Sequence, residues 1–280
     1  MSAARNSRAG TVAANSTAVV VFLVMVFPVY WMVNTALKPR ADVFTRDPKF
    51  FPNPITFEHF ARVIDDNGFL VFARNSLVVT LVVVVLSMIV AFLAATAVAR
   101  FRFKGRRAYI VMILAVQMVP FEALLISMFV MLNSVGLVDK LAGVMVAYLA
   151  FVLPFTIWTL RGFVANVPVD LEEAAMIDGC SRAQAFRRVL FPLIMPGLVA
   201  TSVFAFIQAW NEFILANVIL LSETNYTLPI WLASFQSNFK ETDWSGLMAG
   251  STLFAIPVIV FFVLVQGRIQ SGALAGGVKG

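Results

Sequence analysis

Six long apolar segments, joined by polar connections, form the main pattern along the chain. Each is a continuous hydrophobic block without the alternation of barrel strands. A bilayer core about 30 Å thick requires roughly 20 apolar residues at 1.5 Å per helical residue, and helices satisfy every backbone polar group in lipid. The pattern therefore predicts an all-α membrane protein with six transmembrane helices. The predicted spans are about 17–37, 76–99, 108–132, 141–163, 197–221 and 246–267.

The basic residues predict the orientation of these spans. The short connection RFRFKGRR at 100–107 holds five basic residues and no acid. Short cytoplasmic loops are enriched in Lys and Arg, so we expect this connection and both chain ends in the cytoplasm. The same rule assigns to the cytoplasm the tails 1–16 and 269–280 and the loop 164–196. A cleaved signal peptide is the alternative for the first segment, which is longer than the ~7–15 apolar residues of such signals.

Composition narrows the classes of function. Of the 280 residues, 60% are hydrophobic and 13% are charged, and the net charge is +6. One cysteine (Cys180) and one histidine (His59) leave no material for a disulfide framework or a metal site. An intramembrane protease or lipid-modifying transferase needs a catalytic set at membrane depth, and we find none. The phosphate-binding loop GxxxxGK[ST] is absent, and no basic and aromatic run suits nucleic acid. We expect no enzyme activity.

An acidic stretch, DLEEAAMIDG at 170–179, interrupts the apolar chain on the predicted cytoplasmic side. Pro168 cannot continue the preceding helix. Asp170 and Glu173 have the spacing of an N-terminal capping box, and Gly179 offers a left-handed stop. The pattern predicts a short helix that ends in a glycine corner.

A second helix, RAQAFRRVL, is expected after that corner. Ser181 and Gln184 repeat the capping-box spacing, and Pro192 and Pro196 are expected to end the helix. Two interpretations of this helical pair remain open from the residues alone. It is either an interfacial amphipathic hairpin or a docking site, for which the small side chains of Ala174 and Ala175 allow close approach.

The spacing of this loop resembles the EAA loop of ABC importer permeases. EAAMIDG is followed by nine residues and VLFP, where that family has EAA, three residues, G, nine residues and I-x-L-P; Val189 and Phe191 are the departures. Further segments are similar to the carbohydrate-uptake permeases of the maltose type (MalG-like). They are PNPITFEHF at 52–60, Asn75-Ser76, QAWNEFILA at 208–216, YTLPI at 226–230, LMAG at 247–250 and GGVKG at 276–280.

The resemblance implies a type I ABC importer permease subunit in a bacterial or archaeal inner membrane. Its implied partners are a homologous second permease subunit, an ATP-binding subunit dimer, an extracytoplasmic solute-binding protein and a sugar. The chain itself would hold no cofactor, because ATP and Mg belong to the ATPase subunit. The residues implied to couple to the ATPase are Glu172, Glu173, Ala174, Ala175, Asp178 and Gly179. The tail residues Gly277, Val278, Lys279 and Gly280 are either a further ATPase contact or a frayed end.

Polar residues inside the predicted spans are the remaining candidates. Ionisable groups are costly in a membrane and are functional hypotheses by default. Counted at 1.5 Å per residue, Glu122 and Glu212 lie at similar depth. Together with neighbouring polar and aromatic residues, these glutamates form either a translocation path or gate, or polar contacts that hold helices together. The set is Gln117, Glu122, Gln208, Trp210, Asn211 and Glu212.

An ion-coupled secondary transporter or channel is the alternative function. Inverted repeats are not evident between residues 1–140 and 141–280, and six spans are few for that class. A carrier of that kind would also leave the capped inner hairpin without a role.

Overall fold

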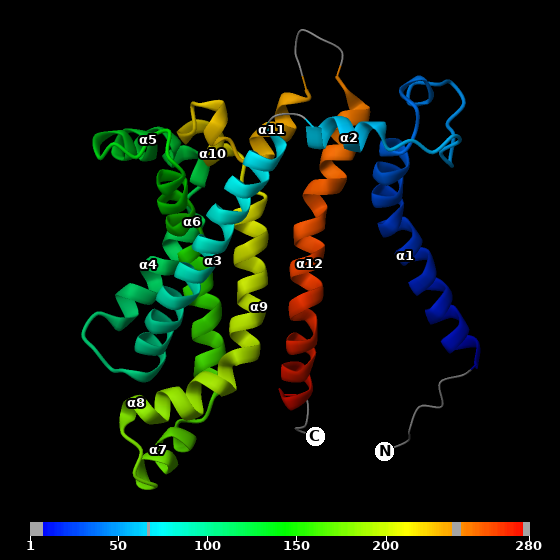
Figure 1. Ribbon diagram of the computed structural model, residues 1–280. Coiled ribbons are helices and arrows are strands. Elements are labelled where there is room, and N and C mark those ends of the chain that lie inside the picture. Colours follow the sequence, from blue (N-terminus) through cyan, green and yellow to red (C-terminus); the bar gives the residue numbers. More distant parts are fainter. Residues whose placement is uncertain (1–7, 66–67, 237–241, 277–280) are drawn as a thin grey trace. The chain divides into compact units, whose positions relative to one another are not determined.

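The computed structural model describes residues 8–65, 68–236 and 242–276, and it confirms the all-α class (Figure 1). Among these residues, five helices are long and apolar enough to cross a membrane, and one bent pair makes a sixth if it counts as one span. The chain divides into two compact units. One comprises residues 1–67 and 232–256, and the other comprises residues 68–231 and 257–280.

The first unit contains α1 (Arg8–Ala36), the short η1 (Arg40–Asp42), α2 (Glu58–Asp65) and the first part of α12 (Trp244–Gly276). Its only histidine, which is buried, is on α2. His59 Nε2 lies 2.9 Å from the backbone carbonyl of Lys38, which fixes α2 against the end of α1. On the same helix, Arg62 forms an ion pair of 2.9 Å with Asp243.

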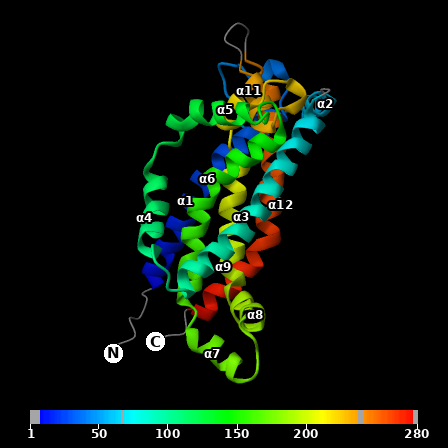
Figure 2. The same cartoon turned by 90° about the vertical axis from the view of Figure 1, so that its left-hand side faces the viewer.

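The second unit is built around three long helices, α3 (Phe69–Arg100), α6 (Leu141–Asn166) and α9 (Phe191–Trp210) (Figures 1 and 2). Small residues of α3 such as Ala91 and Ala95 let these helices approach closely, and Leu160 and Ile194 fill the space between them. The second unit also contains the following shorter elements. They are α4 (Arg106–Met118), η2 (Phe121–Leu124), α5 (Leu125–Ser134), α7 (Val169–Ile177), α8 (Arg182–Ala185), the π-helical turn η3 (Phe186–Leu190), α10 (Ile214–Ile219), η4 (Glu223–Asn225) and α11 (Leu228–Ser234), whose last residues belong to the first unit.

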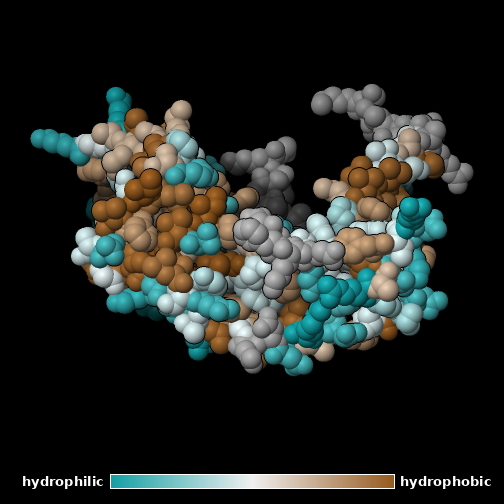
Figure 3. Space-filling view, turned by 90° about the horizontal axis from the view of Figure 1, so that it is seen from above, coloured by the Kyte–Doolittle hydropathy of each residue, from teal (hydrophilic) through white to brown (hydrophobic). Residues whose placement is uncertain are grey.

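Much of the surface is apolar. Brown, hydrophobic side chains cover large areas in the space-filling view (Figure 3), and residues such as Leu93 on α3 and Phe204 on α9 are more than half exposed. Soluble proteins rarely show so much exposed apolar surface. The exposed faces therefore suit contact with lipid or with other membrane helices.

The third predicted span is not a continuous helix. It is broken between α4 and η2, and the two halves are bent by 93°. Pro120 lies at the break and cannot donate a backbone hydrogen bond. The straight helix that was assumed in counting the depth of Glu122 is therefore absent, and the similar depth of Glu122 and Glu212 stays a prediction.

The fifth predicted span, 197–221, is not one continuous helix either. The helix begins at Arg182 and ends at Trp210, and α10 follows after a break. Pro192 and Pro196 do not end the second loop helix, because Pro192 follows the π-helical turn η3. Such a turn changes the hydrogen-bond register locally, so a missing N–H at the next turn is tolerated.

Two polar side chains fix the connections at the end of the second unit opposite α7 and α8. Asn75 donates hydrogen bonds to the carbonyls of Thr224 (3.1 Å) and Tyr226 (3.0 Å). Asp139, at φ +59°, accepts from the backbone N–H groups of Leu221 (2.9 Å) and Ser222 (2.8 Å) and from the Ser222 hydroxyl. These hydrogen bonds hold the pKa of Asp139 well below its ordinary value of 3.8.

We expect Asp139→Asn to lower the thermal stability of the solubilised protein at pH 7. A carboxyl whose folded pKa is depressed stabilises the fold above its unfolded pKa, and this contribution disappears as the pH falls below 3.8. The difference between wild type and variant should therefore shrink towards pH 3. Unfolding temperatures measured at pH 7, 5 and 3 test this, with the exposed Asp65→Asn as control. A difference that is constant with pH would contradict the assignment.

Candidate coupling loop and translocation cavity

The helix α7 begins at Val169, so Asp170, the predicted N-cap, lies inside it. Pro168 precedes it with a fixed φ of −57°, and no side chain caps the helix. The predicted capping box of Asp170 and Glu173 was therefore wrong, since Asp170 lies inside the first turn. There its negative charge, together with that of Glu172, interacts favourably with the positive end of the helix dipole.

The end of α7 is a Schellman turn. The N–H of Cys180 donates to the carbonyl of Ala175 (2.9 Å), and the N–H of Gly179 donates to that of Met176 (3.1 Å). Gly179 has φ +91°, as the sequence predicted, and a Cβ added there would meet nothing within 4 Å. The glycine is therefore required by the backbone conformation and not by crowding within the chain.

The predicted second capping box is confirmed. The N–H of Gln184 donates to the Ser181 hydroxyl (3.3 Å), and the N–H of Ser181 donates to the Gln184 side chain (2.8 Å). From Arg182 the helix continues through η3 into α9 as one segment of 29 residues. The loop is thus joined to a membrane-spanning helix without a flexible connection.

One face of α7 turns towards the transmembrane helices. Arg100, the last residue of α3, places its Nε 2.7 Å from Glu172 Oε1, and the two side chains are only 10% and 15% exposed. The contact is ionic, since the two atoms are not aligned as a hydrogen bond. Arg100 also donates from Nη2 to the carbonyl of Val167 (2.9 Å), directly before α7. One guanidinium group thus fixes both the start and the inner face of α7.

The other face of α7 is exposed. Leu171, Glu173 and Ala174 face outward, and Ile177 at the end of the helix is 87% exposed. The remaining predicted coupling residues divide between the faces, because Ala175 is partly covered whereas Asp178 and Gly179 are exposed. Sequence reasoning missed Arg100, which it counted only as a topology signal, and Ile177. The only signal for Ile177 was a large apolar residue within the acidic stretch.

A second candidate site is a cavity of about 350 Å³ within the second unit. Two of the predicted path residues, Gln117 on α4 and Gln208 on α9, line it. Aromatic rings from η2 and α6 form much of the remaining wall, namely Phe121, Phe151 and Phe155. Amide groups beside aromatic faces suit a ligand with hydroxyl groups and an apolar ring face.

The other predicted path residues do not line this cavity. Trp210 is 1% exposed and stacks on Phe206, with ring centroids 5.7 Å apart, so it cannot reach a ligand there. The Glu212 carboxylate accepts hydrogen bonds from the N–H groups at the start of α10, at 2.8 and 3.2 Å. Asn211 and Glu122 are exposed, outside the lining of this cavity.

Two further kinds of site remain to be considered, the predicted tail contacts and a metal site. The predicted tail contacts at residues 277–280 lie outside the described residues. Within the described part of the chain, no group of three His, Cys, Asp or Glu side chains could hold a metal ion.

These features define a polytopic membrane protein with a helical loop held outside its bundle of long helices. The chain belongs to the family described as the binding-protein-dependent transport system inner membrane component, whose pattern matches residues 84–273. This confirms the resemblance to ABC importer permeases.

Curated relatives match over nearly the whole chain. The diacetylchitobiose uptake system permease protein DasC of Streptomyces coelicolor is 48% identical over 276 residues, covering 99% of this chain and 100% of DasC. The trehalose transport system permease protein SugB of Mycobacterium tuberculosis is 36% identical, covering 90% and 92% of the two chains. The trehalose/maltose permease MalG of Thermococcus litoralis is 32% identical, covering 94% and 95%.

A solved structure confirms the fold. A chain from a bacterial ABC transporter that imports alginate superimposes with a TM-score of 0.78 at 23% identity, covering 95% of this chain and 99% of that chain. The importer permease fold is therefore shared.

We expect Arg100→Ala and Glu172→Ala each to destabilise the protein. The two side chains are largely but not fully covered, so removing one partner should cost about 1–3 kcal/mol, which lowers the unfolding temperature by about 2–10 °C. The exchanged pair, Arg100→Glu with Glu172→Arg, should recover part of this loss. It should not recover all of it, because the hydrogen bond to Val167 depends on Arg100.

Thermal unfolding of the solubilised protein measures these effects, and Arg188→Ala, an exposed arginine on η3, is the matched control. If Arg100→Ala behaves like Arg188→Ala, the ion pair does not hold α7.

Proposed function

We propose that this protein is the permease subunit of an ATP-driven sugar importer and that it couples to a separate ATPase subunit through α7. The main support is the geometry of α7. This helix lies beyond the ends of the long helices of the second unit (Figure 1). It exposes Ile177 at its end, and the Arg100–Glu172 pair braces its inner face.

The outer face of α7 suits docking into a cleft. Ala174 allows close approach of a partner backbone, and Ile177 offers an apolar anchor of the type that dominates binding energy when it is buried. Glu173 and Asp178 add negative charge beside it. A surface helix that only lay in the lipid interface would gain nothing from this acidic flank, because anionic headgroups repel it.

Docking at α7 can act on the cavity through one rigid body. The helix from Arg182 to Trp210 begins directly after the glycine corner and carries Gln208 near its other end. A displacement imposed on the loop by nucleotide-driven closure of the ATPase subunits therefore moves one wall of the cavity. ATP and Mg act on the partner, and this chain contributes no group to their chemistry.

The cavity supports a sugar as the transported substrate. Gln117 and Gln208 present amide donors and acceptors for hydroxyl groups, and Phe151 and Phe155 present faces for the apolar side of a sugar ring. The names of the relatives refer to diacetylchitobiose, trehalose and maltose, which favours a disaccharide. In the proposed assembly, a second permease subunit completes the path and an extracytoplasmic binding protein delivers the sugar.

The proposed orientation places both chain ends and α7 on the cytoplasmic side of the inner membrane. It rests on the basic connection at 100–107. That connection lies at the same end of the second unit as α7 (Figure 2).

We expect Ile177→Asp and Gly179→Val to reduce sugar uptake by about tenfold or more, because the first removes an interface anchor and the second strains a left-handed corner. Both chains should still insert in the membrane. Uptake of labelled sugar by cells and co-purification of the ATPase subunit are the two measurements. Ala183→Ser, exposed on α8, is the control. Normal uptake and normal co-purification in Ile177→Asp would refute docking through α7.

We expect Gln208→Ala and Gln117→Ala to raise the apparent KM for uptake about threefold to tenfold, since each loses a hydrogen bond worth about 0.5–1.5 kcal/mol. ATPase co-purification should be unchanged. Ser127→Ala, exposed on α5 and outside the cavity, is the matched control. If the assembly dissociates while the KM of the remaining complex is normal, these glutamines hold helices together and do not bind substrate.

A further inference from the structure

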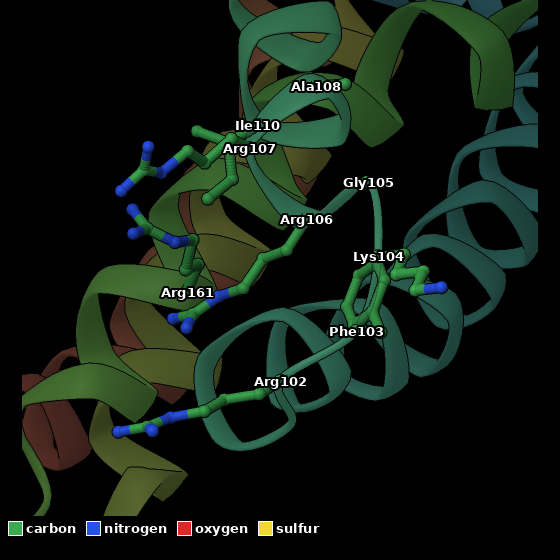
Figure 4. A pocket seen from close by; sticks show the side chains of 9 residues that line it. All are labelled: Arg102, Phe103, Lys104, Gly105, Arg106, Arg107, Ala108, Ile110 and Arg161. Atoms are coloured by element: carbon green, nitrogen blue, oxygen red, sulfur yellow. The ribbon is translucent and has the colours of Figure 1, made fainter.

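A strongly basic pocket lies between α6 and the connection that joins α3 to α4 (Figure 4). It is an open cavity of about 840 Å³. Four guanidinium groups extend to the same side of it, whereas Lys104 points the opposite way. The four groups belong to Arg102, Arg106, Arg107 and Arg161.

These charges have no counter-ion in the pocket. No acidic residue is among those that line it. The Nε atoms of Arg106 and Arg161 are buried without a hydrogen-bond partner in the described chain. Like charges that converge from two helices repel each other, and buried donors that stay unpaired are costly. The arrangement therefore favours the binding of an anion with several acceptor oxygens.

The backbone at the start of α4 adds to the positive charge of the pocket. Gly105, at φ +91°, forms the turn before α4, and no side chain caps the helix. The first turn of α4 holds no acid, so its positive end also faces this region without compensation. On α6, Arg161 lies over the ring of Trp158, 5.2 Å from its centroid, and this contact fixes the direction of its guanidinium group.

The surroundings favour a lipid over a soluble anion. Phe103 and Ile110 line the same pocket beside the arginines. Further along α4, Val111 and Met112 are 63% and 55% exposed, so an apolar surface continues from the basic pocket along the helix. A basic site next to an exposed apolar helix face matches a headgroup with its acyl chains. Trp158 is a residue type enriched at the same boundary.

We propose that this pocket binds the phosphate headgroup of an anionic phospholipid and that the bound lipid bridges α4 and α6. The helix α4 buries only Ile113 among its residues, so side-chain packing holds it weakly. Guanidinium groups bind phosphate oxygens in a bidentate fashion, and Arg106 and Arg161 reach the site from the two helices. The general excess of basic residues in a short loop accounts for orientation. It does not account for the convergence of Arg161 from α6 on that loop.

The test uses the full-length chain in its purified transporter assembly. Native mass spectrometry in detergent, after incubation with phosphatidylglycerol, should show lipid retained on the wild type. The double variant Arg106→Gln/Arg161→Gln should retain at most about one tenth of the lipid retained by the wild type. The matched control Arg187→Gln/Arg188→Gln removes two exposed charges from η3 and should retain lipid like the wild type.

Two further arms identify the ligand. Phosphatidylcholine should be retained poorly, and inorganic phosphate at the same concentration should not raise the unfolding temperature as phosphatidylglycerol does. A second variant, Arg106→Lys/Arg161→Lys, keeps the charges that orient the chain but loses the planar fork, so its retention should fall between those of wild type and the glutamine variant.

The outcomes are distinguishable. Equal retention by the glutamine variant and the wild type, or equal loss in the control, would overturn the site. Equal retention of phosphatidylcholine would overturn its selectivity for anions, and equal stabilisation by inorganic phosphate would overturn the lipid as its source. None of these results depends on which substrate the protein transports.

Discussion

The ion pair between Arg100 and Glu172 is the contact on which the arrangement of the loop that contains α7 and α8 depends. Arg100 ends a membrane-spanning helix, and Glu172 lies on a helix of nine residues that buries no residue fully. So short a helix is not stable by itself in water. Its position is set instead by the charge contact and by the hydrogen bond from Arg100 to the carbonyl of Val167.

The segment that follows the glycine corner at Gly179 is a continuous helix, and it fixes the loop from the other side. The capping box at Ser181 starts a helix that passes through a π-helical turn and two prolines without interruption. Within the second unit, α7 is therefore attached to the end of α3 by a charge contact and to α9 by a short, well-defined turn. A displacement of α7 is therefore transmitted directly to α3 and α9, two of the three central helices.

The sequence predicted those features that depend on local chemistry. The apolar segments, the positive φ at Gly179 and the capping box of Ser181 and Gln184 all follow from composition, backbone preference or spacing over three residues. The family resemblance of the loop was also confirmed. These signals are short in range and need no knowledge of the tertiary structure.

Features that depend on distant contacts were missed or wrong. The partner of Glu172 is 72 positions earlier in the chain (172 minus 100), so no spacing rule connects them. Hydropathy could not place the bend at Pro120, because apolar residues continue on both sides of it. Nor could it show that Trp210 is buried against Phe206 while Gln208, two positions away, lines a cavity. Which face of a helix is covered is decided by its neighbours.

The break at Pro120 has a consequence for water. Where α4 stops at Met118, the last carbonyl groups of the helix lose their intrahelical partners, and this stretch, including Gln117 and Val119, borders the cavity. Irregular backbone at membrane depth persists only where protein covers it or water reaches it. The cavity leaves room beside these carbonyls for water, and the proposed sugar substrate would displace that water with its hydroxyl groups.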